Sequence, residues 1–122
     1  MSRKTVNTYK KQTVESMKKI GTYKDEFLPA IVRYAEMRQQ FCILNEQWQE
    51  DGCKITEPYT NKSGATNNRK TALYLSLETL RKELLEMENL FGLTPAGLKK
   101  IKTDGLKVAG ENLFLKALKE LE

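Results

Sequence analysis

Large apolar residues recur at spacings of three and four between residues 71 and 97, and this repeat constrains the fold more than any other feature. Its members are Leu73, Leu77, Leu80, Leu84, Met87 and Phe91. Residues at this spacing share one face of an α-helix, while the charged residues between them occupy the opposite face. Gly92, Thr94 and Pro95 then suit a helix end followed by the start of a new helix. The apolar face of this helix therefore needs a partner.

A second repeat of the same spacing lies upstream and provides that partner. Its members are Phe27, Ala30, Tyr34, Met37, Phe41, Leu44 and Trp48. We expect a long helix from residue 25 to about residue 51, with Thr22 and Asp25 available as its N-terminal cap and Pro29 confined to its first turn. Two long helices joined by one connection predict an all-α fold built on an antiparallel helical hairpin.

The apolar stripe of the upstream helix is wider than one partner helix requires. The residues that widen it are Ile31, Val32, Ala35 and Ile43. One antiparallel partner would leave part of this stripe exposed, so we expect neighbouring subunits to cover the remainder. The predicted oligomer interface consists of Tyr34, Met37, Phe41, Leu44, Trp48, Leu73, Leu77, Leu80, Leu84, Met87 and Phe91.

Shorter elements precede and interrupt the hairpin. Residues 4–20 predict a weakly amphipathic helix that ends at Gly21 and docks on another element, because its apolar stripe is thin. The connection over residues 52–70 is long and rich in turn-forming residues, which indicates a functional or disordered loop. At most, residues 54–56 and 58–60 pair briefly as strands there, since Pro58 restricts such a strand to an edge.

The C-terminal part predicts one or two short helices after Pro95. We expect the first over residues 96–102, a break at residues 103–105, and a second over residues 111–121. The second either docks on a partner protein or packs back onto the hairpin. The expected units are a basic N-terminal helix or arm (1–24), a helical core (25–103) and a C-terminal helical tail (104–122).

The charge is distributed unevenly along the 122 residues, whose net charge is +5. Residues 1–24 hold seven Lys and Arg against Glu15, which gives +6, whereas residues 25–60 hold three against seven acids, which gives −4. A concentrated basic segment indicates a polyanionic partner, although a basic tail that serves solubility is an alternative. The candidate DNA-binding residues are Arg3, Lys4, Lys10, Lys11, Lys18, Lys19, Lys24, Lys62, Arg69 and Lys70.

Catalytic chemistry has little support in the sequence. The chain has no histidine, and its two cysteines, Cys42 and Cys53, make poor metal ligands by themselves. No glycine-rich phosphate-binding motif is present. We therefore predict no catalytic residue, no metal and no cofactor, and a carboxylate-dependent metal nuclease is an unsupported third hypothesis. No apolar run approaches the length of a membrane span or a signal peptide core, so a cytosolic protein with no membrane partner is expected.

Two stretches together carry a resemblance to a known family. Residues 59–67 read Tyr-Thr-Asn-Lys-Ser-Gly-Ala-Thr-Asn, and residues 90–101 read Leu-Phe-Gly-Leu-Thr-Pro-Ala-Gly-Leu-Lys-Lys-Ile. Separated by the long helix, they make residues 20–103 resemble the small terminase subunits of tailed phages and prophages. Residues 1–20 and 104–122 lie outside the resemblance, and the segment before Phe27 is too short for a three-helix DNA-binding unit.

The resemblance implies a non-catalytic DNA-packaging protein in the cytoplasm of an infected or lysogenic bacterial host. Such subunits bind double-stranded viral DNA at the packaging site and assemble into homo-oligomeric rings. They also recruit and regulate the large terminase subunit, which holds the ATPase and nuclease. The alternative is an oligomeric helical scaffold or regulator that has protein partners only.

Overall fold

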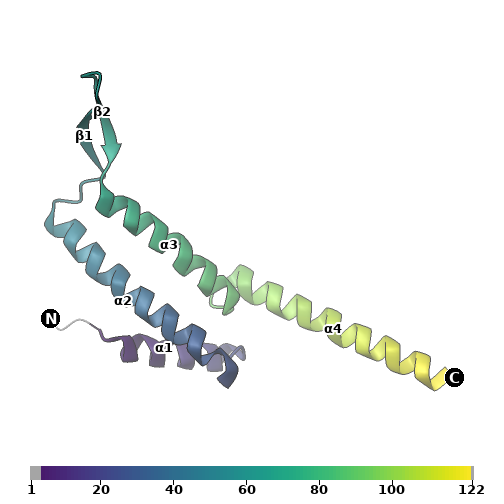
Figure 1. Ribbon diagram of the computed structural model, residues 1–122. Helices are drawn as coiled ribbons and strands as arrows, with labels where there is room; N and C mark the ends of the chain where they lie inside the picture. Colours follow the sequence, from purple (N-terminus) through teal and green to yellow (C-terminus); the bar gives the residue numbers. More distant parts are fainter. Residues whose placement is uncertain (1–3, 122) are drawn as a thin grey trace.

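The computed structural model describes residues 4–121, apart from the side chains of residues 106–109. Three packed helices carry a β-hairpin at one end and a long projecting helix at the other (Figure 1). In chain order the elements are α1 (Val6–Ile20), the 3-10 helix η1 (Asp25–Phe27), α2 (Leu28–Glu50), β1 (Thr56–Thr60), β2 (Thr66–Lys70), α3 (Ala72–Leu90) and α4 (Pro95–Leu121).

Helix α1 begins and ends close to where the sequence predicts. The hydroxyl of Thr5 accepts a hydrogen bond from the amide of Thr8 at 3.2 Å and caps the first turn. Gly21 ends the helix in the left-handed conformation, with φ of 80°. Only glycine adopts this conformation without steric cost, which explains the stop.

The predicted cap of the second helix is wrong. No side chain caps η1 or α2, and the Thr22 hydroxyl instead donates a hydrogen bond to the carbonyl oxygen of Phe91 at 2.8 Å. Thr22 therefore links the turn after α1 to the turn after α3, which lies 69 residues away in sequence. Pro29 lies in the first turn of α2, as predicted.

Helix α3 runs back along α2 in the antiparallel direction (Figure 1). The ring of Tyr34, near the start of α2, meets Phe91 edge to face at the end of α3, with centroids 5.6 Å apart. At the end of the α2–α3 pair that carries the hairpin, the ring centroids of Trp48 and Tyr74 lie 6.0 Å apart. The repeat on α3 faces inward accordingly, and Leu77 has no exposed surface.

The wide stripe of α2 is covered mainly by α1, within the same chain. Met17 of α1 and Ile31 of α2 are fully buried, and they form one core cluster with Tyr34, Leu84 and Phe91. Helix α1 therefore covers part of the surplus that we expected neighbouring subunits to cover, while Val32 and Ile43 remain half-buried.

The fold is mostly helical, as predicted, except that the connection over residues 52–70 forms an antiparallel β-hairpin. The pairing of residues 54–56 with 58–60 is wrong. Thr56 pairs with Lys70, and Thr60 pairs with Thr66. The turn lies at residues 61–65, where Gly64 has φ of 85°. A two-stranded sheet has only edge strands, so it accommodates Pro58.

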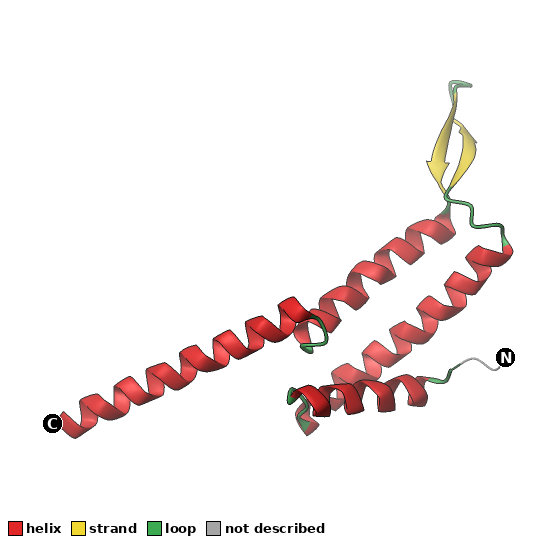
Figure 2. Cartoon of the chain, turned by 180° about the vertical axis from the view of Figure 1, so that it is seen from behind, coloured by secondary structure: helices red, strands yellow, loops and turns green. Residues whose placement is uncertain are grey.

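Helix α4 is continuous from Pro95 to Leu121, and the predicted break at residues 103–105 is wrong. Gly105 keeps a negative φ and has open space around it, so it only weakens the helix. Beyond its first turns α4 projects away from the other helices, as seen from both sides (Figures 1 and 2). The tail therefore does not pack back onto the hairpin, and residues 110–121 are exposed.

The glycines of α4 differ in a way that alanine substitution tests. A Cβ on Gly97 would lie 2.2 Å from the carbonyl oxygen of Asn89, whereas a Cβ on Gly105 would meet nothing within 4 Å. We expect Gly97→Ala to force α4 away from α3 and to lower the free energy of unfolding by about 1–3 kcal/mol. Gly105→Ala should instead leave the helix content at low temperature unchanged and raise the midpoint of thermal unfolding followed by circular dichroism, because alanine is favoured over glycine by about 1 kcal/mol in a helix. A large gain of helix content at low temperature in Gly105→Ala would contradict a continuous α4.

Candidate nucleic-acid interface

Helix α1 turns a basic face away from the core. Tyr9, Thr13 and Met17 are buried on one side of this helix. Lys11 and Lys18 are exposed on the opposite side, two turns or about 10 Å apart. Two exposed cations on one side of a helix suit contact with the phosphates of a nucleic acid.

The other predicted cations of the N-terminal segment have varied surroundings. Lys19 and Lys24 are exposed, and Lys10 is half-buried beside the packed face. The ammonium of Lys4 lies 6.0 Å from the ring centroid of Tyr9, and that of Lys18 lies 5.1 Å from the ring centroid of Tyr23. The predicted Arg3 lies outside the described residues.

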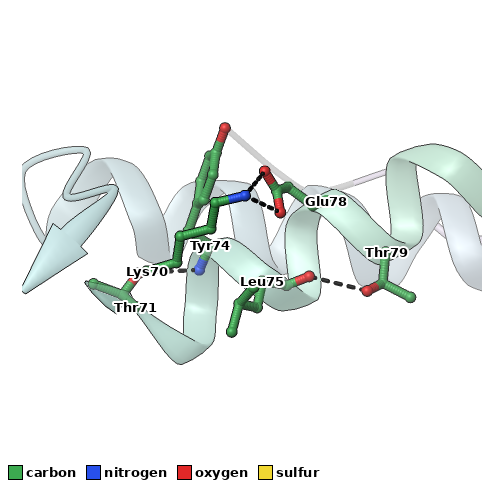
Figure 3. A network of polar contacts seen from close by, with 6 residues as sticks. All are labelled: Lys70, Thr71, Tyr74, Leu75, Glu78 and Thr79. Atoms are coloured by element: carbon green, nitrogen blue, oxygen red, sulfur yellow. Dashed lines mark hydrogen bonds and ion pairs between the residues drawn. The ribbon is translucent and has the colours of Figure 1, made fainter. Parts of the chain in front are cut away.

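Two of the three predicted cations of the hairpin already have acidic partners. The Nε of Arg69 lies 3.2 Å from Oε1 of Glu57, and Nζ of Lys70 lies 3.0 and 3.1 Å from the two carboxylate oxygens of Glu78 (Figure 3). Both pairs are solvent-exposed, so each contributes little to stability and a phosphate can displace the acid. Within the described part of the chain, Lys62 at the hairpin tip makes no ion pair.

The structure does not bring the predicted cations together on one surface. The last turn of α1 lies near the C-terminal end of α3, where Thr22 meets Phe91. The hairpin begins at the N-terminal end of α3, and this helix of 19 residues is about 28 Å long. The chain therefore presents two separate basic regions, one on α1 and one on the hairpin.

The sequence analysis did not include Arg38 and Arg81 among the candidate functional residues, although both lie where the three packed helices meet. Arg38 and Arg81 line a pocket of about 380 Å³ between α1, α2 and α3. The guanidinium of Arg81 lies 5.8 Å from the ring centroid of Phe41. Each arginine directly follows a residue of an apolar repeat, and nearby acids offset its charge in the charge count of the segment. The sequence signal that could have identified them is an arginine next to an apolar position on a helix that also carries aromatic residues.

Arg38 belongs to a polar network around Tyr34. Its Nη1 donates to the Tyr34 hydroxyl at 3.0 Å, and this hydroxyl donates to Oε2 of Glu88 at 3.1 Å. Burial raises the pKa of Tyr34, although Arg38 acts in the opposite direction. Burial alone would lower the pKa of Arg38, but the hydrogen bond and charge interactions with Tyr34 outweigh it, and the pKa is raised. Arg38 therefore remains charged.

The predicted interface residues divide into two groups. Four of them, Tyr34, Leu77, Leu84 and Phe91, are buried inside the chain itself. The others remain half-buried and line the α2–α3 pair: Met37, Phe41, Leu44, Trp48, Leu73, Leu80 and Met87. Only this second group has surface left for a neighbouring subunit.

Neither a metal centre nor a membrane segment emerges from the described residues. Within residues 4–121, no cluster of three or more His, Cys, Asp or Glu side chains is placed to hold a metal ion. No helix in this part of the chain is long and apolar enough to cross a membrane.

The Tyr34 network leads to a test of stability against pH. Because the pKa of Tyr34 is raised in the folded chain, the unfolded chain loses this proton first, and the free energy of unfolding should fall above about pH 10. Tyr34→Phe should reduce that fall and, near pH 7, cost about 1–2 kcal/mol in urea unfolding, because Arg38 and Glu88 lose their shared partner. The matched control is Tyr59→Phe on the exposed hairpin, which should change stability by less than about 0.5 kcal/mol.

Comparison with protein families identifies a match over most of the chain. A family model described as phage terminase, small subunit, matches residues 8–106. The match covers more than half of the chain and includes nearly all of α1, so the expectation that residues 1–20 lie outside the family is too narrow. No curated protein and no solved structure matches the chain.

Proposed function

Because this chain belongs to the phage terminase small subunit family, we propose that it binds viral duplex DNA at the packaging site, assembles into a ring and recruits the large terminase subunit. The family serves DNA packaging and is non-catalytic. The observation that carries the DNA-binding part of the proposal is the basic face of α1, where Lys11, Lys18 and Lys19 are exposed.

Assembly into a ring is supported by apolar surface that the single chain leaves open. Helix α1 packs against the part of α2 that is remote from the hairpin, and Leu44 and Trp48 near the hairpin stay half-buried together with Leu73 and Leu80 of α3. Covering this region with an equivalent subunit removes apolar area from water. A closed ring also repeats the basic regions around its circumference, which strengthens binding to a polyanion.

Recruitment of the large terminase subunit is supported by the exposed end of α4. Leu113, Phe114, Leu118 and Leu121 leave between 44% and 84% of their surface exposed. Large apolar side chains gathered on a projecting helix are typical of a segment that docks on another protein.

Charge removal on α1 tests the DNA-binding proposal. The triple variant Lys11→Gln, Lys18→Gln and Lys19→Gln should lower affinity for a random duplex about tenfold and reduce the slope of log K against log salt by about two to three. The matched control is Lys99→Gln, Lys100→Gln and Lys102→Gln on α4, which removes the same charge from exposed positions elsewhere and should have a smaller effect. Equal affinity of the α1 variant and the unaltered chain, measured by fluorescence anisotropy, would favour the alternative of a scaffold with protein partners only.

Native mass spectrometry tests the assembly proposal. The unaltered chain should give a discrete oligomer, and Leu44→Glu should shift it toward the monomer, because a charge would be buried at the proposed interface. Gln47→Glu places the same charge on an exposed position of the same helix and should leave the oligomer intact. A monomeric unaltered chain at micromolar concentration would refute the ring.

A further inference from the structure

The β1–β2 hairpin stands clear of the packed helices and has no buried face (Figures 1 and 2). Every residue of β2 is exposed, and in β1 only Glu57 is half-buried. An isolated two-stranded hairpin is only marginally stable in water, so its order requires a source other than apolar packing.

Polar contacts provide this order from the tip to the base. At the tip, Oδ1 of Asn61 accepts hydrogen bonds from the amides of Ser63 and Ala65, both at 3.0 Å, and from the Ser63 hydroxyl at 2.7 Å. At the base, the indole of Trp48 donates to the carbonyl oxygen of Lys54 at 2.9 Å. The hairpin is therefore preformed and held in a set direction on the α2–α3 pair.

The strand register gives the hairpin two different faces. One face carries Glu57, Tyr59, Asn67 and Arg69, because Glu57 pairs with Arg69 and Tyr59 with Asn67. Arg69 is occupied on this face, with its Nε 3.2 Å from Glu57 and its guanidinium 4.3 Å from the Tyr59 ring centroid. The cation of this side is therefore engaged, whereas the exposed Asn67 carboxamide has no hydrogen-bond partner among the described residues.

The opposite face, which we call the amide–hydroxyl face, carries Thr56, Thr60, Thr66, Asn68 and Lys70 together with Pro58. Lys70 is paired there with Glu78. The Thr60 and Thr66 hydroxyls lie 3.1 Å apart and hold each other in place. Asn68 is exposed, and among the described residues its carboxamide has no hydrogen-bond partner. Donors and acceptors therefore point into solvent from a preformed surface.

The composition and size of the hairpin fit duplex DNA better than a protein groove. Residues 56–70 contain Lys62, Arg69 and Lys70 against one acid, Glu57, which gives +2, and the amide–hydroxyl face has no large apolar side chain. The DNA major groove is about 12 Å wide and admits a two-stranded β-ribbon. Strands of five residues are about 17 Å long, so the ribbon spans roughly half a turn of the duplex.

We propose that the hairpin enters the major groove and that its amide–hydroxyl face reads base edges, with Asn68 making paired hydrogen bonds to an adenine. Asparagine fits the donor and acceptor of adenine in this groove, and threonine hydroxyls contact either kind of base pair. Lys62 at the tip then reaches a phosphate. This inference rests on the proposed function and deepens it: α1 holds the phosphates without sequence preference, and the hairpin selects the sequence.

The adjacent asparagines make a matched experiment, because Asn67 and Asn68 are both exposed and lie on opposite faces. The full chain, Asn68→Ala and Asn67→Ala are each used to select duplexes from a pool with a randomised segment at about 150 mM salt. The unaltered chain and Asn67→Ala should enrich the same sequence with an adenine at one position. In Asn68→Ala the preference for adenine over the other bases at that position should fall about tenfold. Its affinity for unselected duplex should stay within about twofold of that of the unaltered chain.

Each other outcome overturns the inference in a distinguishable way. Binding to DNA without an enriched sequence, or an enriched sequence that Asn68→Ala retains, would overturn base reading by the hairpin and leave the proposed function standing. No retention of any duplex at low salt would overturn both. A changed oligomer mass for Asn68→Ala in native mass spectrometry, with the selected sequence retained, would place the hairpin at a contact between copies instead.

Discussion

The fold depends on the burial of Tyr34 where three helices meet. Its side chain is 1% exposed, its ring edge meets Phe91 of α3, and Met17 of α1 belongs to the same cluster. A buried tyrosine hydroxyl needs a partner, and here it accepts from Arg38 and donates to Glu88. The Tyr34 ring thus joins α2 to α3 in the core, and its hydroxyl connects the charged groups of Arg38 and Glu88.

The placement of the basic and apolar surfaces follows from this junction. Helix α1 must lie on α2 to bury Met17 and Ile31, and its lysines are therefore turned outward. The same junction holds the turn after α1 against the turn after α3 through Thr22 and Phe91. Since α4 begins directly after that turn and Gly97 lies against the backbone of Asn89, the direction in which α4 projects is set there. The hairpin at the far end of α3 remains free for a separate role.

Sequence patterns succeeded where the controlling forces act over a few residues and failed where they act across the fold. The repeat from Leu73 to Phe91, the stop at Gly21 and the place of Pro29 all follow from helix geometry and backbone sterics. The break expected at Gly105 is absent, because glycine weakens a helix without ending it when the flanking residues are helix formers. The cations of the candidate interface were visible as a charge excess, yet their division into two regions, and the pairing of Arg69 and Lys70 with acids, were not.

The sequence by itself determined that two long amphipathic helices pair, where most helices begin and end, that no histidine is available for chemistry, and that the N-terminal segment carries a concentrated positive charge. The tertiary structure alone decided that α1 covers the second face of α2, that Thr22 bonds to Phe91 instead of capping a helix, and that residues 56–70 form a standing hairpin with two unlike faces. The physical reason is that the first set follows from periodicity and local sterics, which a short window of sequence contains. The second set depends on contacts between residues far apart in the chain, and on a strand register in which a shift by one residue would exchange the two faces.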